Sequence, residues 1–487
     1  MTSTYQRPLE AATLLTGRSH GPEHRYGRSG PAFWDGLTLS SAATPQPLAA
    51  ARSAGLIQAE HLLETACLGS RNGDFAAPSA GAIQPYECYA VVDDDAAPAV
   101  YALDPVRRSG RLLHRGSEVA EALARSHGPV PESGFLLLVA ARPWLSMRKY
   151  GDRGFLYTQL DSGHLATHLL LAAGDQAERA ELLVGPPSAP LSEPLDQLLR
   201  LAARCRQLVS VLRVSGLRPG APARTHTGWS YQDDRSAVPT GDPVAWLEEA
   251  CWDSIPAGGA DAHTDGAPGG RPLPAAGLLT GSSALLPHAP LVGGTDNRAL
   301  AARRRSAKGF RPGPIPLDQL TWALGGMRTA LPVDLPADPR FSATLVARDV
   351  DGLPTGAYDL TAPDAPPRPG AVDPDELVAA CMGQQQLRDA AALVLFHAPR
   401  RSLHSGGRRH PVGPLFRAGA LGHLLYLGAT RAGLAVTAIG GFDSARWAEL
   451  AGLPTEQDVL YILLLGTADG STAKLDRMQT AYAQDEK

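Results

Sequence analysis

The chain has 487 residues, 44% of them hydrophobic, which is enough for more than one domain with a substantial buried core. Its 45 basic and 49 acidic residues give a formal net charge of -4 at pH 7, so a general nucleic-acid partner is not expected. Its five cysteines form no CxxC pair, and no signal peptide or uninterrupted apolar run of membrane-spanning length occurs; we expect a cytoplasmic protein with no disulfide framework, metal site or membrane contact.

In chain order, the sequence predicts one ordered region, a linker and a second ordered region. Residues 1–35 are rich in Gly, Pro, Ser and Arg without apolar periodicity, which indicates a flexible N-terminal segment. In the first ordered region, residues 36–215, the apolar runs of residues 86–92 and 135–141 are typical of buried strands. A long, mostly apolar helix is predicted for LDSGHLATHLLLAAGD. Residues 216–292 are rich in Pro and Gly and predict an interdomain linker around one short helix, DPVAWLEEACW.

The second ordered region covers residues 293–475, and residues 476–487 are a polar tail. Helices are predicted for IPLDQLTWALGG and GPLFRAGALGHLLYLGATRAGL, and strands for FSATLVARDV, LVLFHAP and VLYILLLG. Overlaying the long helices of the two regions places Gly419 on Gly163. Because each helix follows a strand and a short basic loop, we favour a duplicated domain over two unrelated α/β domains.

Four segments carry residues that a binding or catalytic site could use, and each has a plain structural alternative. The small residues of PSAGAIQPYECY (78–89) let the backbone approach a planar ligand, or form a tight turn. RRRSAKGF (303–310) supplies donors for a phosphate, or a solvated basic patch. The paired glycines of AVTAIGGFDSARWAEL (435–450) leave N–H groups to face a ligand, or mark a strand-to-helix turn. RKYGDRG (148–154) is either a proton-transfer motif or a charged helix entrance.

Other familiar site patterns are missing from the sequence. It has no GxGxxG after a strand, no GxxxxGK[ST], no HExxH and no GxSxG, so Rossmann, P-loop, zincin and α/β-hydrolase enzymes lose support. His164, His168 and His423 fall on the predicted interior helices. We expect them to be core or interface residues rather than metal ligands.

Taken together, these segments resemble the nitroreductase-like flavoproteins, and within them the SagB-type branch that oxidises azolines in ribosomal peptides. In that branch a PSAGA loop reading into P-x-E-x-Y, a Lys-Tyr pair followed by G-x-R-G, and a G-H helix come in this order, as they do here. RRSAKGF is similar to the wider superfamily's R-x-S-x-[RK]-x-F phosphate clamp, and IGGFD to its G-F-D turn. The resemblance implies an α+β fold: two nitroreductase-like domains, each an antiparallel-rich sheet flanked by helices, packed as a pseudo-dimer.

The resemblance also implies one composite FMN site, because homodimers of this family hold each FMN between two subunits. The clamp and the GGFD turn occur only in the second half, and the overlay puts Ser405 and Gly406 where Lys149 and Tyr150 would fall. The residues that the resemblance assigns to FMN are Arg304, Ser306 and Lys308 at the phosphate and ribityl end, with Arg305 assisting or replacing Arg304; Pro78, Ser79, Ala80, Gly81 and Gln84 in the loop at the ring; and Gly440 and Gly441 near flavin N5.

The implied reaction is the oxidation of a thiazoline or oxazoline to a thiazole or oxazole in a peptide natural product of the antibiotic type. Lys149 is expected to act as general base, with Tyr150 orienting it or relaying the proton, and oxygen to reoxidise the flavin. The implied partners are an azoline-containing precursor peptide and a YcaO-type cyclodehydratase complex. Two alternatives stay open: an NAD(P)H-dependent nitroreductase or enone-type flavin oxidoreductase, and a non-catalytic scaffold of a peptide-modifying complex.

Overall fold

A computed structural model gives the fold of most of the chain. It describes residues 53–470, together with the short strands β1 (Leu39–Ser41) and β2 (Gln46–Pro47). The gaps within 53–470 are residues 68–75, 95–96, 106–107, 185–192, 218–228, 234–236, 240–244, 256–272, 274, 280–282, 288–290, 292–294, 363–365, 369–371 and 405–411. The predicted N-terminal segment (1–35), the polar tail (476–487), Ser405 and Gly406 therefore lie outside the described residues.

The first half of the chain forms an eight-stranded sheet in the order β2-β9-β5-β4-β3-β6-β8-β7. Its central strand β6 reads FLLLVAA and is buried at every position, because helices cover both faces of the sheet. The elements of this half are β3 (Tyr86–Asp94), β4 (Ala97–Asp104), β5 (Ser109–Arg115), β6 (Phe135–Ala141), β7 (Ala177–Leu183), β8 (Gln207–Leu217) and β9 (Ser230–Asp233), with α2 (Ala54–Cys67), α3 (Ser117–Ala124), α4 (Pro143–Tyr150), α5 (Arg153–Gln176) and α6 (Glu193–Leu199).

The second half forms a six-stranded sheet in the order β11-β18-β16-β13-β15, with β17 also paired to β18. Its elements are β11 (Phe310–Arg311), β13 (Ser342–Ala347), β15 (Gly356–Asp359), β16 (Ala392–Pro399), β17 (Ala435–Ile439) and β18 (Gln457–Ala468), with α8 (Thr295–Arg303), α9 (Leu317–Gly325), α10 (Pro374–Ala380), α11 (Gly413–Ala432) and α12 (Ser444–Leu450). A separate parallel pair joins β12 (Ile315–Pro316) to β14 (Val350–Asp351). None of the helices in the described part of the chain combines the length and apolarity that a membrane crossing needs.

The two halves share one strand order. The first half contains β4-β3-β6-β8-β7 and the second contains β15-β13-β16-β18-β17, with antiparallel pairing throughout both sets. In each half one long helix comes immediately before the last edge strand, α5 before β7 and α11 before β17. The predicted α+β class with antiparallel-rich sheets is therefore confirmed, and the shared strand order is what a duplicated domain would leave.

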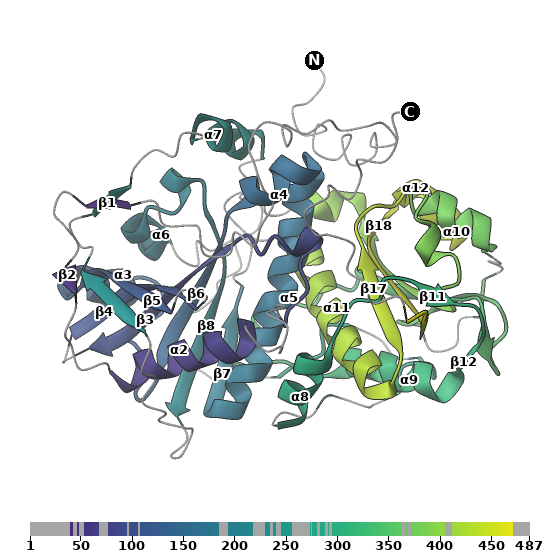
Figure 1. Ribbon diagram of the computed structural model, residues 1–487, viewed down its shortest axis with the longest axis horizontal. Helices are drawn as coiled ribbons and strands as arrows, with labels where there is room; N and C mark the ends of the chain where they lie inside the picture. Colours follow the sequence, from purple (N-terminus) through teal and green to yellow (C-terminus); the bar gives the residue numbers. More distant parts are fainter. Residues whose placement is uncertain are drawn as a thin grey trace.

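Helices α5 and α11 lie side by side at the centre of the molecule, between the purple-to-blue first half and the green-to-yellow second half (Figure 1). A methyl group on Gly163 would collide with the Phe416 carbonyl oxygen, and one on Gly419 would collide with the Leu160 carbonyl oxygen. The overlay that places Gly419 on Gly163 also places Phe416 on Leu160, so the contact is reciprocal, as at a two-fold interface. Only glycine allows so close an approach of two helix backbones.

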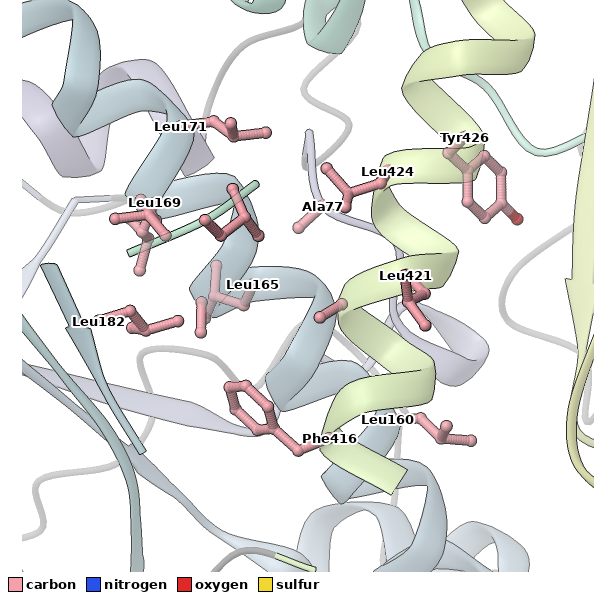
Figure 2. Close-up of a cluster of buried hydrophobic side chains, with 14 of the residues drawn as sticks. Ala77, Leu160, Leu165, Leu169, Leu171, Leu182, Phe416, Leu421, Leu424 and Tyr426 are labelled. Carbon is pink, nitrogen blue, oxygen red and sulfur yellow. The ribbon is translucent and has the colours of Figure 1, made fainter. Parts of the chain in front are cut away.

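Apolar side chains surround this crossing and explain why both helices are hydrophobic on most faces. Leu160, Leu165 and Leu169 of α5 and Phe416 and Leu424 of α11 belong to one buried cluster that extends into both sheets (Figure 2). Each helix packs one face on its own sheet and another on the opposite helix, so few positions are left for polar residues. Three polar residues of α5, Arg153, Tyr157 and Asp161, lie at the candidate site described below.

The expectation of a linker over residues 216–292 is wrong for the described parts of that segment. Strand β9 pairs in parallel with β5 in the first sheet, and β10 (Ala237–Pro239) pairs with β1. Helix α7 (Ala245–Ser254) packs on α4, and its buried Glu248 accepts two hydrogen bonds from Arg142 (2.7 and 2.8 Å) and one from Arg206 (2.6 Å). These ion pairs tie α7 to the first half, which composition alone does not reveal.

Candidate active site

The PSAGA loop and the Lys149–Tyr150 pair meet directly. The loop contains a short 3₁₀ turn, Ala80–Ala82, and Gly81 has a positive φ of 61°. A methyl group on Gly81 would collide with the Tyr150 hydroxyl and lie 2.9 Å from Lys149 Nζ. Glycine is needed here both for the left-handed backbone and for the close approach. The first two motifs of the first half are thus parts of one surface.

Helix α4 presents Lys149 and Tyr150 at its last turn. Pro143 occupies the first helical position, and Trp144 and Leu145 pack with Ile83, the residue that follows the 3₁₀ turn of the loop. Both members of the pair are half-buried. The Tyr150 ring contacts Tyr157 of α5 edge to face, with 5.0 Å between ring centroids. The pair is therefore held against protein on two sides, unlike a solvated helix entrance.

One face of α5 carries three polar residues at intervals of four. Arg153, Tyr157 and Asp161 follow one another at i, i+4 and i+8, so they line up along a single stripe of the helix. A methyl group on Gly440 of the second half would collide with the Tyr157 ring. Tyr157 thus lies between the Lys149–Tyr150 pair and the turn formed by residues 440–442, called the glycine turn below. It connects the two halves at this point.

Asp161 fastens the PSAGA loop to α5. The Ser79 hydroxyl donates to Asp161 Oδ2 at 2.7 Å, and the Ala80 N–H donates to the same oxygen at 3.0 Å. The Ser79 oxygen in turn accepts from the Gln84 N–H at 3.1 Å, and the Gln84 side chain donates to the Ala77 carbonyl. Burial raises the pKa of Asp161 to about 7, although these hydrogen bonds act to lower it. Ser79 and Gln84 therefore shape the loop from within.

The glycine turn of the second half is held by its carbonyl groups. Arg153 Nη1 donates to the Gly440 oxygen at 3.5 Å and Nη2 to the Phe442 oxygen at 3.2 Å, while Gln384 Nε2 donates to the Gly441 oxygen at 2.9 Å. Gly441 and Phe442 are buried. Their N–H groups make no hydrogen bond to any residue that the structure describes. Two buried donors of this kind fit a ligand that presents acceptor atoms.

The RRRSAKGF segment also joins the two halves. Arg304 is only 6% exposed; its Nε donates to the Ala76 carbonyl at 2.7 Å, and its guanidinium lies over the Tyr426 ring, 5.3 Å from the centroid. Ser306 Oγ lies 3.0 Å from the Tyr426 hydroxyl. Lys308 is exposed. Arg304 therefore has a structural role at the start of the PSAGA loop that the sequence did not predict, and its contact with a phosphate stays a prediction.

The three histidines of the long helices lie in the core, as predicted. Burial lowers the pKa of His164 to about 3 and that of His168 to about 4, and it lowers that of His423 well below the usual value. The rings of His168 and His423 lie 5.1 Å apart, and His164 Nε2 bonds the Tyr461 hydroxyl. These neutral rings fill the interface between α5 and α11. Within the described residues, no three His, Cys, Asp or Glu side chains are arranged to hold a metal ion.

Residues from both halves thus lie in one continuous series of contacts. The contacts above bring together the loop residues, the Lys149–Tyr150 pair and the glycine turn, and Ala76 connects the same loop to Arg304. Sequence reasoning missed four of its members: Tyr157, Asp161, Gln384 and the cross-half role of Arg153. The first, second and fourth had a signal, since residues spaced by four on a helix lie on one face.

Comparison with known proteins agrees with this picture of the fold. Residues 350–467 match the sequence model of the Nitroreductase family. This match lies entirely within the second half of the chain. A curated protein of Methanocaldococcus jannaschii, provisionally named a nitroreductase, is 37% identical to this chain over 101 residues. That match covers 20% of this chain and spans half (50%) of the relative's length.

Solved structures extend the similarity to both halves. The crystal structure of a provisionally named nitroreductase from Anabaena variabilis aligns with a TM-score of 0.64 and 20% identity, covering 96% of this chain and 100% of that chain. The nitroreductase-like fold therefore includes the first half, which the family model does not match. A chain of the E. coli microcin synthetase McbBCD complex with truncated pro-MccB17 bound has a TM-score of 0.28 and 13% identity, over 37% of this chain and 74% of that chain. A TM-score this low supports no conclusion about the function.

Proposed function

We propose that the protein is an FMN-dependent oxidoreductase with one flavin site per chain. The residues fit such a cofactor in one specific respect: the turn at Gly441 and Phe442 offers two buried N–H donors without partners among the described residues. A flavin ring has acceptor atoms along one edge and needs donors of this kind. Gly81 lets the loop backbone lie close to the side chains of Lys149 and Tyr150, which places this pair beside the loop.

The observation that carries the proposal is the meeting of motifs from both halves at one place. Gly81 touches Lys149 and Tyr150, Tyr150 touches Tyr157, and Tyr157 touches Gly440. The residues that would hold FMN are Ser306, Lys308 and Arg304, assisted by Arg305, at the phosphate and ribityl end; Pro78, Ser79, Ala80, Gly81 and Gln84 beside the ring; and Gly440 and Gly441 at the turn. Nothing in this arrangement requires a second, mirror-image site.

The substrate we propose is a thiazoline or oxazoline ring in a precursor peptide, which a YcaO-type cyclodehydratase would supply. Its conversion to a thiazole or oxazole removes one proton and one hydride, and bound FMN supplies the hydride acceptor. Lys149, as the neutral amine, takes the proton from the ring carbon. Tyr150, whose ring centroid lies 5.4 Å from Lys149 Nζ, orients this amine. The contact of both residues with Gly81 keeps the amine beside the loop.

The flavin content of the purified protein tests the cofactor and the single site together. We expect one FMN per chain from the ratio of visible to protein absorbance after reconstitution with FMN. A ratio of two would contradict the composite site. A colourless protein that takes up no FMN would contradict the enzyme and favour a scaffold of a peptide-modifying complex.

Replacement of Lys149 by Ala tests the proposed base. Loss of one general base typically lowers the rate by about 10²- to 10⁴-fold, so we expect azoline turnover to fall in this range while FMN stays bound. Arg125→Ala, which removes an exposed cation at the end of α3, is the matched control. Normal turnover by Lys149→Ala would remove the base role. Fast bleaching of the flavin by NADPH with turnover of nitroaromatics or enones, and none of azolines, would instead favour the nitroreductase or enone-type activity.

A further inference from the structure

The three carbonyl groups of the glycine turn are each engaged by a side chain from outside the turn. Arg153 binds the oxygens of Gly440 and Phe442, and Gln384 binds the oxygen of Gly441. In a trans peptide the C=O of one residue and the N–H of the next point in opposite directions. Anchoring a carbonyl therefore also fixes the direction of the following N–H.

This rule gives a direction to each N–H of the turn. The N–H of Gly441 points away from Arg153, and the N–H of Phe442 points away from Gln384. The next N–H, that of Asp443, donates to the Ala380 carbonyl at 2.9 Å. Of these three donors, only the first two lack a partner among the described residues. Gly441 and Phe442 are buried residues, and buried N–H groups are nearly always paired, so both donors are available to a ligand with acceptor atoms.

We propose that Arg153 and Gln384 are positioning residues that aim the N–H groups of Gly441 and Phe442 at the acceptor edge of the cofactor. This inference rests on the proposed function, since FMN is the acceptor it assumes. Arg153 suits the task because its planar guanidinium offers two donors in a fixed fork, and these reach two carbonyls of one turn. A lysine, with a single donor centre, would not hold both carbonyls in the same way.

The two positioning residues come from different halves. Arg153 is the first residue of α5, and Gln384 follows α10 in the loop where Met382 and Gly383 have positive φ. The Gln384 amide also donates to the Cys381 carbonyl at 2.9 Å, which fixes its orientation. The turn of the second half is therefore aimed partly by the first half. If Arg153 and Gln384 only joined the halves, replacing them would change the stability of the protein alone. If they position the N–H groups, replacing them would also change the affinity and spectrum of the bound flavin.

Three variants in the full-length protein separate these roles. Arg153→Met removes both donors, Arg153→Lys keeps the charge without the fork, and Gln384→Met removes the third anchor with little change in size. The control is Arg446→Met on α12, whose exposed side chain pairs only with Glu376 and Glu449 among the described residues. For each protein we would measure the Kd for FMN by fluorescence quenching, the visible spectrum and midpoint potential of bound FMN, and folding by circular dichroism.

We expect Arg153→Met to raise the Kd for FMN by roughly tenfold or more, in line with the loss of one charged hydrogen-bond anchor. Gln384→Met should raise it by about fivefold, Arg153→Lys should fall between wild type and Arg153→Met, and both Met variants should shift the spectrum and potential. Arg446→Met should leave all of these unchanged. Folded Met variants with the wild-type Kd, spectrum and potential would overturn the inference. A wild-type protein that binds no FMN would instead overturn the proposed function. If Arg153→Met does not fold, the same measurements on Gln384→Met and Arg153→Lys decide whether these residues position the N–H groups.

Discussion

The two halves of the chain have the same strand order, but they contribute different residues to the candidate site. Each contributes one glycine-rich helix to the central crossing, at Gly163 and Gly419. Helix α5 also carries Arg153, Tyr157 and Asp161, which lie at the candidate site. The overlay pairs Asp161 with Arg417 of α11, whose guanidinium donates to the carbonyls of Leu278 and Pro336. A polar position that serves the site in one half thus serves packing in the other.

The fold and the chemistry of the two halves respond to different constraints. Both sheets need their helix and both helices need their glycine, so these features occur twice. The Lys149–Tyr150 pair and the glycine turn at Gly440 occur once each and meet in one place. In the first half, the segment between β7 and α6 that corresponds to this turn, residues 185–192, lies outside the described residues.

The largest effect is expected at the helix crossing that the halves share. The double substitution Gly163→Ala with Gly419→Ala places a methyl group against a backbone oxygen on each side, and we expect unfolding to become easier by about 4 kcal/mol. Urea denaturation would measure this. The matched control is Gly174→Ala on the exposed end of α5, where the added methyl meets nothing within 4 Å; it should be neutral or stabilise by up to about 1 kcal/mol. Equal effects of the two changes would mean that the crossing does not depend on glycine.

The next effect concerns α7, which the sequence placed in a linker. Glu248→Gln removes the carboxylate that binds both Arg142 and Arg206, whose side chains are only 6% and 5% exposed, although Arg206 keeps its ion pair with Glu87. We expect a loss of about 3 kcal/mol in the free energy of unfolding. Glu249→Gln, at the exposed neighbouring position, is the control. If Glu248→Gln unfolds at the wild-type urea concentration, α7 is not an integral part of the first half.

The sequence predicts the parts of this molecule that depend on local pattern. The apolar runs of β6 and β18, the two long helices and the pairing of Gly163 with Gly419 all follow from period and composition. Membership of α7 in the first half depends instead on charges far apart in the chain, Glu248 with Arg142 and Arg206. No window of sequence contains such a pair.

The site divides in the same way. The motif residues Lys149, Tyr150 and Gly440 could be named from short segments, because the chemistry of each segment is local. That Gly81 contacts Lys149, or that Arg304 binds the Ala76 carbonyl, depends on how two sheets pack. Asp161 could be predicted in part. Its spacing from Tyr157 and Arg153 can be read from the sequence, but its hydrogen bond to Ser79 of the loop cannot.

The smallest effect is a pH dependence that belongs to Asp161. Its pKa rises from 3.8 to about 7 on folding because of burial. Between these values the unfolded chain has released the proton and the folded chain keeps it, so stability falls as the pH rises. We expect this residue to contribute a loss of about 2 kcal/mol between pH 5 and pH 6.5, since one proton gives at most about 1.4 kcal/mol per pH unit.

The buried histidines oppose this trend, so total stability is the wrong quantity to follow. The folded-state pKa values of His164, His168 and His423 are lowered, and each histidine makes the protein more stable as the pH rises toward 6.5. The difference between wild type and Asp161→Asn isolates the carboxyl group, because all three histidines stay in both proteins. The free energy of unfolding of Asp161→Asn should rise relative to that of wild type as the pH rises. The control, Asp152→Asn at an exposed position, should not show this trend. A flat difference for Asp161→Asn would mean that the carboxyl group is ionised beneath the loop throughout this range, and the anchor of Ser79 would then be a charged one.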